Sequence, residues 1–233
     1  MTNRVYFEDL DEKTREKHIE RSICLCAMEF YKLNLFQEHK YYLDLEVDIS
    51  IETALRFDLG YASDSHGELI KHLNKMGFSK QDLAKSSLFK VGEKGELCEV
   101  FQDRLMIPIR DEYGNYIGFC GYSKDKQPKH LISSHSPAFD SKEHLFGLNF
   151  ACEFDSLILC ENYFGVIRMA NSGVNNVVAT FGTTFLTTSQ VDLLKKHAEK
   201  VYIDPISDDL GIRFAAHALD LLQKNDISSS IID

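Results

Sequence analysis

Acidic residues in the last third of the chain follow apolar, strand-like runs or begin a helical pattern. Glu161 and Asp204 each come directly after such a run, and Asp208 and Asp209 begin a helical stretch. Mg²⁺ prefers oxygen ligands, usually one or two carboxylates completed by water and substrate phosphate. Carboxylates at the ends of neighbouring parallel strands can hold such an ion where a phosphoryl group is transferred. We therefore predict Glu161, Asp204 and Asp208 as catalytic and metal-binding residues. The alternative for Asp208 and Asp209 is a simple acidic helix start.

Basic residues gather in a polar stretch before these acids. The basic side chains of interest are Arg104, Lys124, Lys126, Lys129 and Lys142. Lysines on a polar loop are usually solvated surface, which is the simpler interpretation. A phosphate-handling cleft also needs positive charge beside its acids. Gly182, followed by two threonines, is a weaker candidate for a phosphate-contacting turn.

The cysteines and histidines lack the paired spacing of a zinc site. The six cysteines are scattered, and only Cys24 and Cys26 are close together. A zinc ribbon needs four ligands, usually in two short clusters. We therefore expect reduced, partly buried thiols. His130, His135 and His144 are expected to be loop residues rather than ligands.

Alternating strand and helix patterns must position the acids. The first third is mostly helical, and two apolar runs, 104–109 and 116–121, flank a hairpin-like turn; the polar segment 123–142 is expected to be a long loop. From residue 156 strands and helices alternate, which predicts right-handed crossovers and a parallel sheet. Thr187 to Gln190 has capping-box form. Function in such sheets collects at the carboxyl ends of the strands.

Composition sets limits on these interpretations. The chain has 233 residues and a formal net charge of −10, which disfavours generic nucleic-acid binding but leaves room for a local basic groove. It contains no apolar run long enough to span a membrane, and its acidic N-terminus is not a secretory signal. We expect a cytoplasmic protein that does not bind membranes.

Several motifs together resemble the bacterial DnaG-type DNA primases. The segment 101–122 resembles the signature F-x-x-R…F-P-I-x-D-x-x-G…G-F-G-G-R of that family. Residues 128–131, Phe139, Lys142 and 145–148 are similar to its P-K-Y-L, F-x-K and L-Y-G-L elements, and 161–184 matches E-G-Y-x-D-V…G-T without a gap. The lead-in at 42–62 is similar as well. The resemblance covers roughly residues 24–223, and its later part is the toprim fold.

The resemblance implies a fold and an activity. The fold class is α/β, with an α+β N-terminal subdomain and a toprim subdomain with a parallel sheet. We expect a helical segment at 1–40, a primase-core subdomain at 41–150 and the toprim subdomain at 151–233. The implied activity is DNA-templated synthesis of RNA primers in replication, a nucleotidyl transfer, with Mg²⁺ or Mn²⁺ as cofactor. Partners would be single-stranded DNA and NTPs, and also a helicase or a separate zinc-ribbon module.

Individual residues follow the family pattern unevenly. Arg104, Lys129 and Lys142 match basic positions that contact template or nucleotide, with Lys124 nearby, and Glu161 matches the first toprim acid. The second acid of the family is replaced by Gly165. Counted back from Gly211, the D-x-D motif falls on Ile206 and Asp208, so one aspartate is missing unless Asp204 substitutes. Tyr122 and His130 replace the Arg of F-G-G-R and the Tyr of P-K-Y.

These departures leave alternatives to a fully active primase. A catalytically inactive module with the same fold could bind single-stranded DNA or a replication or regulatory protein. Another toprim chemistry, such as nucleolytic cleavage, has no specific support, and the primase-like upstream half disfavours it.

Overall fold

The computed structural model describes residues 10–38, 43, 48–182, 185–205 and 208–232. The chain forms two compact units, which we describe one at a time. Unit 1 comprises Met1–His39, Gly60–Pro108 and Tyr116–Phe139, and unit 2 comprises Lys40–Leu59, Ile109–Asn115 and Asp140–Asp233. The domain boundaries expected after residues 40 and 150 stay predictions.

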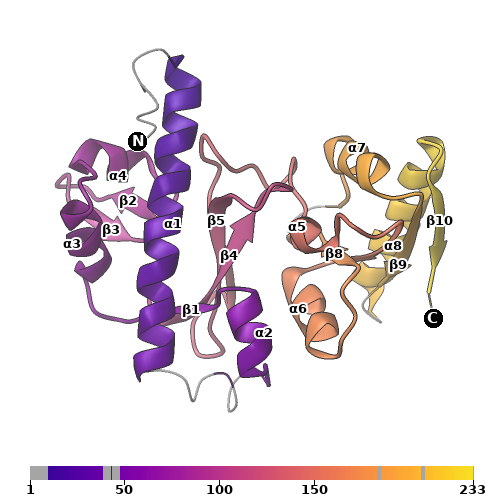
Figure 1. Cartoon of the computed structure of the whole chain (residues 1–233), viewed down its shortest axis with the longest axis horizontal. Coiled ribbons are helices and arrows are strands. Elements are labelled where there is room, and N and C mark those ends of the chain that lie inside the picture. The colour runs from indigo at the N-terminus through magenta and orange to yellow at the C-terminus, as the bar shows by residue number, and fades with distance from the viewer. Residues whose placement is uncertain (1–9, 39–42, 44–47, 183–184, 206–207, 233) are drawn as a thin grey trace, which may run out of the picture. The chain divides into compact units, whose positions relative to one another are not determined.

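Unit 1 combines a long helix with a four-stranded sheet and a small hairpin (Figure 1). Its elements are α1 (Glu12–Glu38), β1 (Gly60–Ala62), α3 (Glu68–Lys75), α4 (Lys80–Lys85), β2 (Phe89–Val91), β3 (Leu97–Glu99), β4 (Arg104–Arg110), β5 (Tyr116–Tyr122) and β6 (His130–Ile132). The last two residues of β4 belong to unit 2. The main sheet has the order β1-β4-β5-β6, and β2 pairs with β3.

Helix α1 packs against β1 and β5 because apolar residues recur on one of its faces. Ile23, Ala27 and Tyr31, spaced four residues apart, are all buried. Gly60 begins β1 under this helix, and a Cβ atom there would lie 2.5 Å from the Cβ of Tyr31. Glycine therefore permits the close approach of the helix to the sheet.

The segment expected to be a long loop contains a short strand. β6 pairs antiparallel with β5, with Leu131 opposite Gly121 and His130 opposite Tyr122. The loop prediction for 123–142 was therefore wrong at residues 130–132. A three-residue edge strand leaves little periodic signal in the sequence.

Unit 2 is an alternating α/β structure. Its elements are α2 (Ile51–Arg56), α5 (Leu148–Ala151), β7 (Ser156–Cys160), α6 (Tyr163–Asn171), β8 (Val177–Ala179), α7 (Thr188–His197), β9 (Lys200–Asp204), α8 (Asp209–Lys224) and β10 (Ser228–Ile231). The strands are parallel, in the order β10-β9-β7-β8. The predicted parallel sheet is confirmed.

Helices of unit 2 cover this sheet and begin at well-formed caps. Helix α8 packs against β9 and β10, and α6 packs against β7 and β8 (Figure 1). Asn162 caps α6, and Thr187 and Gln190 form the predicted capping box of α7. These caps fix where each helix begins relative to the preceding strand.

Candidate active site at the strand ends

Three strands of the unit 2 sheet end side by side. Cys160, the last residue of β7, is in register with Ala179 of β8 and with Asp204 of β9. Glu161 follows Cys160 directly, so the sheet brings the ends of β7 and β9, with their acids Glu161 and Asp204, to the same edge. Both acids are half-buried. Sequence pattern alone predicted this placement.

The Cys160 thiol lies next to the Asp204 carboxylate. Its Sγ is 3.9 Å from Oδ2 of Asp204 and can donate a weak hydrogen bond to it. Burial, and then the negative charges of Asp204 and Glu161, raise the pKa of Cys160 to about 12. The thiol is therefore protonated at neutral pH and acts as a neutral neighbour of the carboxylates. No motif in the sequence singled out Cys160 for this position.

The turn after β8 approaches the backbone at Glu161. The Thr180 hydroxyl donates to the Glu161 carbonyl at 2.8 Å. Gly182 adopts a left-handed conformation, and a Cβ atom there would lie 3.7 Å from the same carbonyl oxygen. Gly182 is thus at the predicted site edge, whereas Thr183 and Thr184, the other members of that turn prediction, lie outside the described residues.

Asp208 is the N-cap of α8. Its Oδ1 accepts a hydrogen bond from the Gly211 amide at 2.8 Å, and the residue is exposed. Asp209 lies in the first helical turn, where negative charge suits the helix dipole. The helix-start interpretation is confirmed for both residues. A metal-binding role for Asp208 stays a prediction.

Strand β9 ends in an aspartate two residues before the first position of the D-x-D motif. The count back from Gly211 placed that motif position at Ile206, which lies outside the described residues. Strand β9 ends at Asp204, in register with Cys160. The substitution of Asp204 for the missing aspartate of the motif stays a prediction.

Gly165, at the position of the family's second acid, lies close to the Cys160 side chain. A Cβ atom at Gly165 would lie 3.2 Å from Cβ and 3.4 Å from Sγ of Cys160. Any side chain at residue 165 would therefore press on the Cys160 side chain.

The two acids suit a cation that takes most of its ligands from water and substrate phosphate. Within the described residues, no three His, Cys, Asp or Glu side chains lie close enough together to hold a metal ion. Mg²⁺ commonly takes only one or two protein carboxylates and completes its shell with water and substrate phosphate. Glu161 and Asp204 supply such a pair of hard oxygen donors, so this donor set fits Mg²⁺ or Mn²⁺.

The predicted basic residues fall into buried and exposed classes. Arg104 is 4% exposed and donates hydrogen bonds to the carbonyls of Pro128, at 2.8 Å, and Lys129, at 3.0 Å. Lys124 and Lys129 are exposed in unit 1. The structure therefore places Arg104 inside the protein, whereas the two lysines are on its surface.

Lys142 belongs to unit 2, where a turn holds it at the start of α7. Its carbonyl accepts a hydrogen bond from the Thr187 hydroxyl at 2.6 Å, and its side chain is exposed. Gln190 is fully buried and donates to the carbonyls of Ser141, at 3.0 Å, and His144, at 2.8 Å. The capping-box pattern of Thr187 and Gln190 predicted the start of this helix, but it did not predict the contacts of Gln190 with the 141–144 turn.

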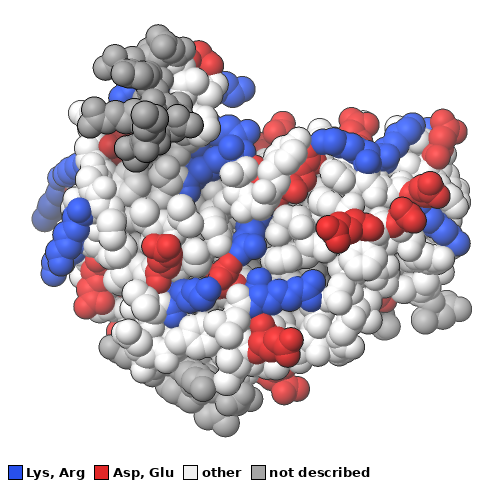
Figure 2. Space-filling view, viewed as in Figure 1, with Lys and Arg blue, Asp and Glu red and all other residues white. Residues whose placement is uncertain are grey.

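Positive and negative side chains are interspersed on the face that Figure 2 shows, in keeping with the net charge of −10. On this face, electrostatic binding of an anion depends on a few specific side chains.

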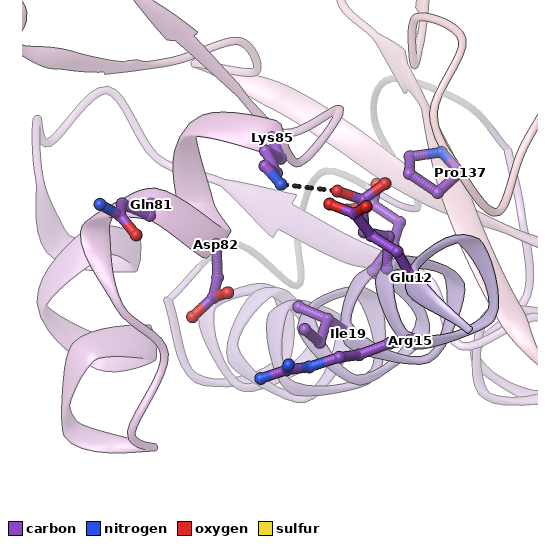
Figure 3. A pocket seen from close by; sticks show the side chains of 9 residues that line it. Glu12, Arg15, Ile19, Gln81, Asp82, Lys85 and Pro137 are labelled. Carbon is purple, nitrogen blue, oxygen red and sulfur yellow. Dashed lines mark hydrogen bonds and ion pairs between the residues drawn. The ribbon is translucent and has the colours of Figure 1, made fainter. Parts of the chain in front are cut away.

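A separate cavity of unit 1 contains none of the predicted site residues. It has a volume of about 190 Å³ and lies between α1 and α4, where Lys85 pairs with Glu16 at 2.6 Å (Figure 3). Beneath it, Glu20 is buried and accepts hydrogen bonds from the Ser87 amide and hydroxyl. The paired charges and the cap contacts of Asp82 give this cavity a structural explanation.

Comparison with known proteins decides the family. The family model described as "DNA primase catalytic core, N-terminal domain" matches residues 30–152, and the "Toprim-like" model matches residues 158–233. The chain belongs to the DnaG-type DNA primase family. The resemblance recognised in the motifs is thus confirmed, and so is the predicted α/β fold with a toprim portion.

Relatives in the family are substantially longer than this chain. The DNA primase of Clostridium acetobutylicum is 34% identical over 197 residues, which make up 83% of this chain and 32% of the relative. That of Aquifex aeolicus is 39% identical over 180 residues, covering 75% of this chain and 36% of the relative. The chain therefore spans about a third of the length of these relatives.

Solved primase structures share the fold. A DnaG primase catalytic domain bound to ssDNA superposes with a TM-score of 0.85 at 25% identity, covering 94% of this chain and 75% of that one. The Aquifex aeolicus primase, solved with its zinc-binding and RNA polymerase domains, gives a TM-score of 0.85 at 32% identity, covering 97% of this chain and 56% of that one.

Among the described residues, no helix is both long and apolar enough to cross a membrane.

Proposed function

We propose that this chain is a primase catalytic core that synthesises RNA primers on a single-stranded DNA template during replication. The observation that carries the proposal is the combination of family membership over both halves of the chain with two carboxylates, Glu161 and Asp204, at adjacent parallel strand ends. The DnaG relative of known structure was solved with ssDNA, which supports the same template class here.

The proposed chemistry assigns separate roles to the two acids and the exposed lysines. Glu161 and Asp204 would hold Mg²⁺ or Mn²⁺, and Asp208 would add negative charge at the start of α8. The bound cation would neutralise charge on the phosphate oxygens of the incoming nucleotide. Lys124, Lys129 and Lys142 would bind phosphate groups of template and nucleotide, because lysine acts as a compact point charge.

We also propose a division of functions between the two parts of the chain that the sequence predicts. Residues 151–233 would carry the toprim chemistry, and the preceding part would bind the template. The cation-binding acids all lie in unit 2, whereas Lys124 and Lys129 lie in unit 1. Helicase or zinc-ribbon partners would supply recruitment and template selection.

A primer-synthesis assay tests this function directly. Purified protein is incubated with single-stranded DNA, labelled NTPs and Mn²⁺ or Mg²⁺, and extension products are resolved by gel. Glu161→Gln and Asp204→Asn should each lower product formation roughly 100-fold or more, because a mispositioned phosphate costs orders of magnitude in rate. Glu153→Gln and Asp192→Asn, exposed acids of the same unit, serve as matched controls and should retain activity.

The same assay separates an active primase from an inactive module. Absence of product above the Glu161→Gln background, with intact ssDNA binding, would leave the binding-module alternative. Absence of both product and binding would remove the nucleic-acid function altogether.

A further inference from the structure

Two of the exposed lysines proposed to bind template or nucleotide lie in backbone turns. Each of these turns accepts hydrogen bonds from a buried side chain. Lys129 follows the turn that Arg104 contacts, and Lys142 lies in the turn that Gln190 contacts. In each case the buried residue donates two hydrogen bonds to main-chain carbonyls at the lysine or within two residues of it. We propose that Arg104 and Gln190 are positioning residues that act through Lys129 and Lys142, an inference that rests on the proposed function.

Arg104 is buried, and its guanidinium donates hydrogen bonds to two main-chain carbonyls. Its Nη1 donates to the Lys129 carbonyl at 3.0 Å and its Nη2 to the Pro128 carbonyl at 2.8 Å. Its aliphatic part packs at Gly121, where an added Cβ would lie 3.0 Å from Arg104 Cδ and 2.6 Å from Phe101 Cδ1. A buried guanidinium must be hydrogen-bonded to offset its desolvation, so these carbonyls are its structural partners.

The Lys129 backbone is fixed from two directions. Its carbonyl accepts a second hydrogen bond, from the Ser123 amide at 3.0 Å. The next residue, His130, pairs in register with Tyr122 across β5 and β6, with ring centroids 5.2 Å apart. Arg104 therefore determines where the exposed Lys129 side chain leaves the sheet, and it does so without reaching the surface.

Gln190 has the corresponding role in unit 2. Its Oε1 accepts from the Thr187 amide as part of the capping box, while its Nε2 donates to the carbonyls of Ser141 and His144. These carbonyls flank Lys142 on both sides. The same fully buried amide thus fixes the start of α7 and the turn that presents Lys142.

The two halves of the Gln190 amide can be tested separately. Gln190→Glu keeps an acceptor for the Thr187 amide, as in an ordinary capping box, but loses both donors to the 141–144 turn. Gln190→Met loses acceptor and donors together. For Arg104 the matched pair is Arg104→Lys, which keeps the positive charge, and Arg104→Met, which loses it.

Salt-dependent DNA binding distinguishes positioning from direct contact. Binding of a fluorescein-labelled 16-residue oligothymidylate is titrated from 0.05 to 0.5 M NaCl. Each phosphate contact on single-stranded DNA contributes about 0.7 to the slope of log affinity against log salt, or roughly fivefold in affinity at 0.1 M salt.

Lys129→Ala should remove one such contact. Arg104→Met should reproduce that loss, add nothing to Lys129→Ala in the double variant, and be partly rescued in Arg104→Lys.

Corresponding results are expected for unit 2 with Lys142→Ala, Gln190→Glu and Gln190→Met. Additive losses in either double variant, with a slope reduced by about 1.4, would overturn the positioning role and indicate direct contact. Lys90→Ala, an exposed lysine on β2, is the control lysine substitution.

Hydrogen–deuterium exchange provides a readout that does not need DNA. Arg104→Met should speed exchange of the Ser123 amide, and Gln190→Glu should speed that of the Lys142 amide, which donates to Asp140 at 2.8 Å. Exchange in the other unit should stay at the wild-type rate. Unchanged exchange at these amides would overturn the inference. Failure of the wild-type protein to bind DNA would instead contradict the proposed function, while exchange would still decide whether the two turns are held.

Discussion

Asp204 ends β9 directly opposite Cys160, the last residue of β7, and the two side chains lie 3.9 Å apart between Oδ2 and Sγ. Register partners on neighbouring strands present their side chains to the same face of a sheet. A shift of one residue would turn Asp204 to the other face. The register of β7 and β9 therefore places the Asp204 carboxylate next to the Cys160 thiol at this edge of the sheet.

Asp208 should contribute to stability through its cap. Asp208→Ala removes the acceptor for the Gly211 amide and should lower the free energy of unfolding by about 1 kcal/mol. Asp208→Asn keeps an acceptor and should stay within about 0.5 kcal/mol of the wild type. Urea unfolding monitored by circular dichroism measures both. A loss in the asparagine variant as large as in the alanine variant would show that charge, rather than capping, is what matters.

Restoring an acid at residue 165 should harm the protein. Gly165→Asp places a Cβ atom 3.2 Å from Cys160 Cβ and adds a third carboxylate near Asp204 and Glu161. Overpacking of this kind costs about 1–3 kcal/mol, so the thermal midpoint should fall. Ser134→Asp adds the same charge at an exposed loop position and should leave the midpoint nearly unchanged. A Gly165→Asp variant as stable as wild type would contradict the assigned crowding.

Glu112 should stabilise unit 2 above acidic pH. Partial burial opposes its ionisation, but hydrogen bonds from Lys196, Tyr113 and His197 lower the pKa of Glu112 to about 2 from its ordinary 4.5. A depressed carboxyl pKa stabilises the folded state above pH 4.5, and that stabilisation is lost as the pH falls toward 2. We expect Glu112→Gln to lower the free energy of unfolding by about 2 kcal/mol at pH 7, a value discounted for the exposure of Lys196.

Unfolding in urea between pH 7 and pH 3 measures this difference. The gap between wild type and Glu112→Gln should narrow steadily below pH 4.5, the ordinary pKa of this carboxyl. The exposed Glu153 gives the matched variant Glu153→Gln, which should show no such gap. A gap that persists unchanged at pH 3 would exclude the ion pair as its cause.

Glu20 should show the opposite pH dependence. Burial raises the pKa of this carboxyl above its ordinary 4.5, although hydrogen bonds from Ser87 partly offset the effect. A raised carboxyl pKa favours the folded state fully below pH 4.5, and that advantage disappears as the pH rises through the folded pKa. Relative to Glu20→Gln, the wild-type protein should therefore lose stability from pH 4.5 upward.

Parallel urea titrations of the two proteins test the sign. Gln can keep the acceptor for the Ser87 amide and hydroxyl, so the substitution isolates the charge. Glu29→Gln, at an exposed position of the same helix, controls for the change in net charge. A wild-type protein that gains stability relative to Glu20→Gln with rising pH would contradict the assignment.

Local sequence patterns were enough to predict the order of strands and helices along the chain from residue 156 onward. They also predicted the capping box at Thr187 and Gln190 and the positions of Glu161 and Asp204 at strand ends. Each of these depends on neighbours within a few residues, through helical or alternating periodicity and local side-chain caps. The family resemblance also rests on local motifs, which is why it was visible before the fold.

Three features became visible only in the folded chain: Arg104 is buried, β6 interrupts the polar segment, and the Cys160 side chain lies close to Gly165. Arg104 meets the Lys129 carbonyl 25 residues away, and Gln190 meets the His144 carbonyl 46 residues away. Such contacts depend on which strands and turns pack together, and they leave no periodic signal near either residue. From sequence alone, a basic residue inside a motif is therefore predicted to be exposed and to contact nucleic acid. Its burial is known only from the packing around it.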